Sequence, residues 1–169
     1  MFNIGEKIIY GTNGAFTVED IRDENVLGTL RRYYILSPVG GNADSRVYVP
    51  LDSEKLVSAM RKPVSREEAE RIIAEARDIP EAEWKGDNRA RMDSFRKIME
   101  SGDHRKMISV IKSVKRNSED RKETGKKSYM TDENALKRAE KLLCSELALS
   151  LGASEDEVLD LIKRACGDK

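Results

Sequence analysis

The sequence predicts an α+β protein, in which a small N-terminal β-barrel of the Tudor or SH3 type is followed by an all-α helical domain. Two observations support this fold class. In the first sixty residues, short apolar stretches alternate with polar residues, the pattern of half-buried strands. From about Ser65 onward, apolar residues recur every three or four positions, the pattern of amphipathic helices. We therefore expect two domains, residues 1–60 and 65–169, with Pro63 in the linker between them.

The first domain is expected to contain four or five short strands. Turn signals at Asn13-Gly14, Gly28 and Gly40-Gly41 separate its apolar stretches, and Asn-Gly is among the strongest such signals. The stretches are EKIIYG (6–11), TNGAFTVEDI (12–21), RRYYILSPVGGNADS (31–45) and RVYVPL (46–51). Short strands joined by tight turns favour a curled sheet that closes on itself, because closure limits the exposed edges.

The helices of the second domain are predicted from their caps. Ser65 and Ser154 each precede a glutamate by three positions, the capping-box pattern. The expected helices cover residues 66–77, 89–101 (after a cap at Asp87 or Asn88, and ended by Gly102), 104–116 (capped by Asp103), 131–151 (ended by Gly152) and the segment from 155. The polar run RNSEDRKETGKKS (116–128) has no apolar period and is predicted to be a mobile loop.

Each predicted helix presents an apolar face to the core. The residues expected there are Met92, Phe95, Met99, Met107, Ile108, Ile111, Val114, Leu136, Leu143, Leu147, Leu151, Val158, Ile162 and Ala165.

Little in the chain suggests enzyme chemistry. Its only histidine, His104, lies at a predicted helix start without a serine or cysteine motif around it, and we expect it to face solvent. The common glycine-rich phosphate-binding motifs are absent. Cys144 and Cys166 lack the spacing of a zinc site or a disulfide framework, so both are expected to be reduced. We predict no enzyme activity, no small-molecule substrate, no cofactor and no metal.

Two further features bear on location. The apolar runs fall short of a membrane span, and the start of the chain, MFNIGE, lacks the pattern of a secretory signal. A cytoplasmic protein that does not contact membranes is therefore expected.

The charge of the chain is unevenly distributed. The formal net charge is zero, which disfavours coating of nucleic acid through bulk charge. Residues 84–127 nevertheless hold fourteen Lys or Arg against seven Asp or Glu, and the only tryptophan, Trp84, begins this segment. Two interpretations stay open. The indole packs over Phe95 or Met99 as part of the core, or it is an exposed wedge flanked by phosphate-binding cations, as in minor-groove proteins.

Several segments, in their order and spacing, point to a family. They are FNIGEKIIYGTNGAFTVEDI, YYIL, VYVP, a tryptophan before a helix that ends in SGD (Trp84 and Ser101-Gly102-Asp103), and LKRAEKLLCSELALSLG. Through them essentially all 169 residues resemble the CarD/CdnL family of bacterial transcription regulators, whose first domain is related to the polymerase-binding module of transcription-repair coupling factor.

The resemblance implies a Tudor-like domain that docks on the RNA polymerase β subunit and a helical domain that contacts promoter DNA. That contact would be weakly sequence-specific and would lie in the minor groove at the upstream edge of the bubble. Trp84 would be the wedge that stabilises the open complex, and Arg91, which matches a basic family position, would also bind DNA. Lys85 and Arg89 are expected to contact phosphates because they lie near Trp84. The implied polymerase-binding residues are Val26, Leu27, Arg46 and Tyr48.

A different class of function remains as the alternative. In it the chain is a protein–protein adaptor, whose Tudor-like module binds one partner and whose helical domain binds another protein, with no direct DNA contact. Trp84 would then lie in the protein's own core.

Overall fold

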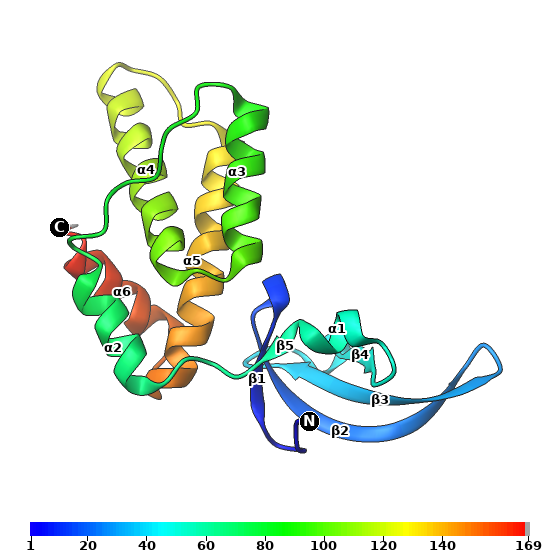
Figure 1. Cartoon of the computed structure of the whole chain (residues 1–169). Helices are drawn as coiled ribbons and strands as arrows, with labels where there is room; N and C mark the ends of the chain where they lie inside the picture. The colour runs from blue at the N-terminus through cyan, green and yellow to red at the C-terminus, as the bar shows by residue number, and fades with distance from the viewer. Residues whose placement is uncertain (168–169) are drawn as a thin grey trace. The chain divides into compact units, whose positions relative to one another are not determined.

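The computed structural model describes residues 1–167, which divide into two compact units, Met1–Pro63 and the chain from Val64 onward. Strands dominate the first unit and helices make up the second, so the predicted α+β class is confirmed (Figure 1). Among residues 1–167, no helix has the length and apolar character needed to cross a membrane. Within the same residues, no group of three or more His, Cys, Asp or Glu side chains is placed to hold a metal ion.

The first unit is built on a five-stranded antiparallel sheet with the order β4-β3-β2-β1-β5. Its strands are β1 (Lys7–Tyr10), β2 (Ala15–Val26), β3 (Thr29–Pro38), β4 (Val47–Pro50) and β5 (Met60–Arg61). Strands β2 and β3 form a long, curved hairpin (Figure 1). The strands predicted from the sequence are thus confirmed. The structure adds β5, which was not predicted. Ile8, Val18, Leu36 and Val49 are fully buried at the centre of this unit.

The sheet is open, which corrects the predicted barrel. Among the described residues, the ladders end at β4 on one side and at β5 on the other. These edge strands have only four and two residues, too few to pair along their length and close the sheet. A short helix, α1 (Glu54–Ser58), follows β4, and its Val57 packs against the core together with Leu51 and Ala59. The unpredicted helix therefore covers apolar surface that a closed barrel would bury.

The turn between β2 and β3 confirms the turn predicted at Gly28. Leu27 and Gly28 form a two-residue loop in which both φ angles are positive, 51° and 80°. Type I′ hairpin turns need this conformation. Glycine adopts it freely, whereas a leucine there carries backbone strain. Val26, Leu27 and Leu30, which we call the hairpin tip, all expose their side chains.

The second unit contains α2 (Arg66–Glu75), α3 (Asn88–Ser101), α4 (His104–Glu123), α5 (Met130–Leu151) and α6 (Glu155–Ala165). Their starts and ends confirm most of the predicted caps. The side chains that accept a hydrogen bond from the backbone N–H three residues later are those of Ser65, Asp87, Asp103 and Ser154. Gly102 and Gly152 end α3 and α5 in the left-handed conformation.

Two apolar clusters form the core of the second unit. One joins α2, α4, α5 and α6, with Ile72, Ile108 and Leu143 at its centre. The other joins α3, α4 and α5 around Phe95 and Val114. The apolar faces predicted from the sequence all contribute to these clusters, although Met92, Leu136, Leu151 and Ala165 are only partly buried.

The predicted loop after residue 116 is wrong over its first half, because α4 continues to Glu123. Arg, Lys and Glu favour helix on an exposed surface even where no apolar face guides the prediction. The remaining link, residues 124–129, is attached to α4. The Arg121 Nε donates to the Lys127 carbonyl oxygen at 2.8 Å, and the hydroxyls of Ser118 and Ser128 are hydrogen-bonded to each other.

Two side chains of the second unit also differ from expectation. The Glu68 carboxylate, predicted to complete a capping box with Ser65, instead accepts a hydrogen bond from Arg105 at 2.9 Å. His104 is not solvent-facing, because its Nε2 lies 2.7 Å from Oε2 of the buried Glu146. The second oxygen of Glu146 accepts from the Val64 backbone at 3.0 Å. Each of these contacts joins residues far apart in sequence, where local patterns carry no signal.

Candidate nucleic-acid interface

Trp84 lies on the segment between α2 and α3, which runs across α4 (Figure 1). The Ala82 N–H donates to the Ser109 carbonyl oxygen at 3.0 Å, and the Ser113 hydroxyl donates to the Ala82 carbonyl oxygen at the same distance. Because both partners belong to α4, the chain is fixed two residues before Trp84. A side chain on an irregular segment is thereby held in a defined position.

The indole of Trp84 is partly buried and partly accessible. Its ring meets that of Phe95 edge-on, with 6.4 Å between centroids. The guanidinium carbon of Arg91 lies 4.5 Å from the indole centroid, a cation–π contact. The two interpretations of Trp84 therefore do not exclude each other. The ring packs on Phe95 as the core interpretation requires, while part of it stays on the surface.

Arg91 is 2% exposed, and five protein oxygens bind its guanidinium. Nε and Nη2 donate to the two carboxylate oxygens of Asp132 at 2.9 and 3.1 Å, a bidentate pair. The remaining bonds go from Nη1 to the carbonyl oxygens of Lys85 (2.8 Å) and Gly86 (3.3 Å), and from Nη2 to Asn88 Oδ1 (3.1 Å). The N–H donors of Arg91 are all used inside the protein, so this geometry gives no support to the predicted contact of Arg91 with DNA. Its bonds join the Trp84 segment to α3 and α5.

A second aromatic ring shares this arrangement. The Arg91 guanidinium carbon lies 5.8 Å from the Tyr129 ring centroid, and that of Arg121 lies only 4.1 Å from the same centroid. We call Trp84, Arg91, Tyr129 and Arg121 the aromatic surface. Sequence analysis missed Tyr129 and Asp132, because one ends a polar run and the other resembles an ordinary first-turn helix acid.

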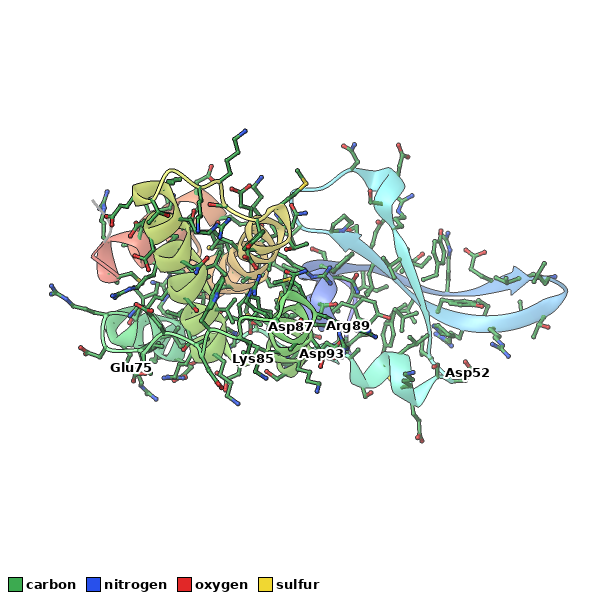
Figure 2. The ribbon with its side chains drawn as sticks, turned by 90° about the horizontal axis from the view of Figure 1, so that it is seen from above. Asp52, Glu75, Lys85, Asp87, Arg89 and Asp93 are labelled. Carbon is green, nitrogen blue, oxygen red and sulfur yellow. The ribbon has the colours of Figure 1, made fainter. Side chains whose placement is uncertain are left out.

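The cations predicted beside Trp84 are exposed. Lys85 and Arg89 lie in the segment that leads into α3 and in its first turn, close to Asp87 and Asp93 (Figure 2). Neither basic side chain makes an ion pair with the part of the chain that the structure describes. The hydrogen bonds from Arg96 and Lys97 hold the pKa of Asp93 below its ordinary value, so Asp93 is ionised but paired. Lys85 and Arg89 are available to an external anion.

The four residues predicted to bind polymerase fall into two groups in the first unit. Val26 and Leu27 belong to the hairpin tip, where Leu30 adds an exposed leucine that the sequence had not indicated. Tyr48 lies in β4, is about half exposed, and meets Tyr33 edge-on. Arg46 precedes β4 and makes two hydrogen bonds to the Glu19 carboxylate, at 2.8 and 2.6 Å.

The strand register separates the two groups. Val26 is opposite Thr29 and Tyr48 is opposite Ile35, and these two β3 residues are six positions, or about 20 Å, apart along the strand. Any single partner that touched both groups would follow the length of the hairpin.

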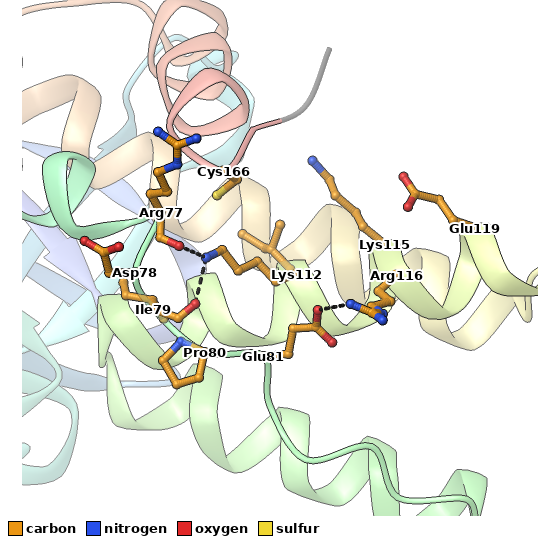
Figure 3. A pocket seen from close by; sticks show the side chains of 11 residues that line it. Arg77, Asp78, Ile79, Pro80, Glu81, Lys112, Lys115, Arg116, Glu119 and Cys166 are labelled. Atoms are coloured by element: carbon orange, nitrogen blue, oxygen red, sulfur yellow. Dashed lines mark hydrogen bonds and ion pairs between the residues drawn. The ribbon is translucent and has the colours of Figure 1, made fainter.

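A hollow of about 490 Å³ lies elsewhere in the second unit, between the segment after α2 and the side of α4 (Figure 3). The Lys112 Nζ donates to the carbonyl oxygens of Arg77 and Ile79 at 2.9 and 2.6 Å, and Arg116 pairs with Glu81 at 3.3 Å. These cations of the hollow serve the protein's own carbonyls and carboxylates.

Comparison with family models covers both units of the chain. Residues 2–64 match the model described as the CarD-like/TRCF RID domain. Residues 68–163 match the model described as the CarD C-terminal domain. The two matches follow each other in the order that the sequence resemblance predicts, and the second alone spans more than half of the chain.

Proposed function

The chain belongs to the CarD/CdnL family of RNA polymerase-interacting, non-enzymatic transcription regulators, and from this premise we propose that it holds promoter DNA open at the upstream edge of the bubble. In this proposal the first unit docks on the polymerase β subunit. The second unit places Trp84 in the minor groove where the duplex begins to part. The observation that carries the proposal is Trp84 itself: a partly exposed indole, fixed from behind by Arg91 and flanked by the exposed Lys85 and Arg89.

Each side chain then has a distinct task at the DNA. An apolar wedge between base steps unstacks them, and the indole of Trp84 is the side chain suited to this. Lys85 and Arg89 would neutralise the phosphates on either side, which positions the protein without reading sequence. Arg91 would act as a positioning residue, because its bonds to the Lys85 carbonyl oxygen and to Asp132 fix the backbone next to Trp84.

The mechanism follows from differential binding. A wedge that fits only parted DNA shifts the closed–open equilibrium by as much as it binds the open state more tightly. A contact worth about 1.4 kcal/mol changes the ratio of open to closed complexes tenfold. Docking on polymerase raises the effective concentration of the second unit at the promoter. Weak intrinsic affinity for DNA, and a net charge of zero, are therefore compatible with this function.

Docking would use the hairpin tip together with Arg46 and Tyr48. Exposed aliphatic and aromatic side chains of this kind are what protein–protein contacts bury. The backbone of Leu27 is strained at φ, and its exposed side chain makes no core contacts that would compensate. Backbone strain of this kind is retained where function requires it, which supports a role for the tip.

The test is the lifetime of open promoter complexes formed by bacterial RNA polymerase. We expect the wild-type protein to prolong this lifetime. With Trp84→Ala the lifetime should be about tenfold shorter than with wild type. Trp84→Phe, which keeps a flat ring, should retain part of it. Circular dichroism would establish that both variants are folded. A folded Trp84→Ala variant that prolongs the lifetime as wild type does would refute the wedge.

The packing of Trp84 on Phe95 favours a second candidate, the adaptor without DNA contact. On that hypothesis the protein binds polymerase but leaves the open-complex lifetime unchanged. Acrylamide quenching gives an independent check. An adaptor predicts equal quenching of Trp84 in the presence and absence of the polymerase–promoter complex, whereas a wedge predicts protection in the complex.

A further inference from the structure

Tyr129 occupies the N-cap position of α5, where its side chain has no structural role in capping. Its carbonyl oxygen accepts hydrogen bonds from the Asp132 and Glu133 N–H groups, both at 3.1 Å, but its side chain accepts none. Ser, Thr, Asp or Asn is favoured at such a position because the side chain can satisfy a free N–H. An aromatic residue is therefore not explained by the helix that it begins.

The ring of Tyr129 is supported by a guanidinium group, and the residue is half exposed. The guanidinium carbon of Arg121, 4.1 Å from the centroid, supports the ring, and Arg121 is in turn tied to the Lys127 carbonyl oxygen. Half of the Tyr129 surface remains exposed. This combination of a supported ring and free surface is suited to accept a second flat π-system, which is how aromatic side chains bind unpaired bases.

The turn that leads to Tyr129 is rich in basic residues. Residues 121–127 carry four cations, Arg121, Lys122, Lys126 and Lys127, against one anion, Glu123. Lys122, Lys126 and Lys127 make no ion pair among the residues that the structure describes, and Arg121 is engaged by the Tyr129 ring and the Lys127 carbonyl oxygen. A phosphate backbone that crossed this turn would meet these cations while a base reached the ring.

Arg91 connects this surface to the proposed wedge. Its guanidinium carbon lies 4.5 Å from the Trp84 centroid and 5.8 Å from the Tyr129 centroid, so the two rings share one buried cation. In duplex DNA the faces of the bases are covered by stacking. Only a strand that has already parted can present a base to Tyr129, and Trp84 is proposed to act where the strands part.

We propose that Tyr129 is a second DNA contact, which stacks on an unpaired base of the melted promoter while the turn at residues 121–127 neutralises the adjacent phosphates. This inference rests on the proposed function. It adds a single-strand contact to a wedge that acts on the duplex edge. The protein would then bind both sides of the fork and would recognise the parted state through two aromatic rings.

The experiment uses photo-crosslinking in complete polymerase–promoter complexes. Single 5-iodouracil bases are placed in turn across the upstream edge of the bubble on each strand, and crosslinked peptides are mapped by mass spectrometry. We expect one unpaired position to crosslink to Tyr129. Tyr129→Ala should abolish that crosslink and leave crosslinks to Trp84 in place. The matched control is Leu161→Ala, which removes an apolar side chain of similar exposure (41% against 50%) from α6 and should leave every DNA crosslink intact.

The open-complex lifetime supplies the functional readout. Loss of base stacking should shorten it about tenfold in Tyr129→Ala, and Tyr129→Leu should behave alike because leucine keeps bulk without a π-face. Tyr129→Phe should match wild type. Crosslinks that map to Trp84 alone, or a wild-type lifetime in Tyr129→Ala, would overturn this inference and leave the wedge standing. A wild-type protein that neither crosslinks to DNA nor alters the lifetime would overturn both proposals.

Discussion

The hairpin tip and the aromatic surface both expose apolar groups, but they are built in opposite ways. At the hairpin tip, aliphatic side chains project from a two-residue turn that is itself strained at Leu27. At the aromatic surface, Trp84 and Tyr129 rest on guanidinium groups, one of which is buried and bound by Asp132. The first surface thus has little behind it, while the second is tied through Arg91 to α3, to α5 and to the segment between α2 and α3.

This difference matches what each proposed partner requires. A protein partner can fold its own side chains around projecting leucines, so the tip needs exposure more than rigidity. Parted DNA offers flat rings and phosphates, which demand aromatic faces held at fixed positions among cations. Rigidity at the aromatic surface is supplied by a buried ion pair rather than by apolar packing alone.

The largest expected effect comes from breaking that ion pair. Asp132→Ala would leave the Arg91 guanidinium buried without its bidentate partner, which typically costs about 3–5 kcal/mol. We expect the free energy of unfolding of the second unit to fall by that amount. Trp84, the only tryptophan, reports directly on this unit, so urea unfolding followed by its fluorescence is the measurement.

The matched control for Asp132→Ala is Arg96→Ala. It removes two pairs with Asp93 and Glu100 on the exposed face of α3, and should change stability by less than about 1 kcal/mol. If both variants unfolded at the same urea concentration, Arg91 would not be the support that distinguishes the aromatic surface from the hairpin tip.

A smaller and opposite effect is expected at the hairpin tip. Leu27→Asn replaces a strained leucine by a residue that tolerates positive φ. The free energy of unfolding of the first unit should therefore rise by about 0.5–1 kcal/mol. The same change removes an apolar contact proposed to bind polymerase and should weaken binding to the β subunit about tenfold. Circular dichroism and a direct binding assay measure the two effects separately.

Leu161→Asn serves as the control for Leu27→Asn, because it removes a partly exposed leucine from α6 of the other unit. It should leave polymerase affinity unchanged. Undiminished affinity in Leu27→Asn would mean that the tip is not a docking surface, whatever the gain in stability.

Local chemistry made much of the fold predictable. Asp87, Gly102 and Asp103 bracket α3 and begin α4 through bonds to residues no more than four positions away, so their types in the sequence suffice. The strands of the β2–β3 hairpin were likewise predictable from alternation and a glycine turn. The two-residue β5 and the short α1 were not, because they are formed by packing against the rest of the first unit.

The candidate site was predictable only in part. Trp84 was noticeable as the only tryptophan in a basic segment, and Lys85 and Arg89 followed from their nearness to it. The burial of Arg91 was not predicted, because its partner, Asp132, is 41 residues away and nothing in the sequence pairs them. Tyr129 was missed for the same reason, since its significance comes from guanidinium groups brought to it by the fold.

The smallest effect concerns the core cluster that joins α2, α4, α5 and α6. Cys144 lies on α5, the helix that carries Asp132, and burial, followed by the nearby Glu140 charge, raises the pKa of its thiol from 9.0 to about 12. At about pH 8 its thiolate fraction is then lowered about a thousandfold, so a thiol reagent should modify the half-buried Cys166 and spare Cys144. Absorbance with a disulfide reagent should count one thiol in the native protein, two in urea, and none in native Cys166→Ser. Rapid reaction of Cys144 in the native protein would mean that α5 opens readily. The support for Trp84 and Tyr129 would then be no firmer than that of the hairpin tip.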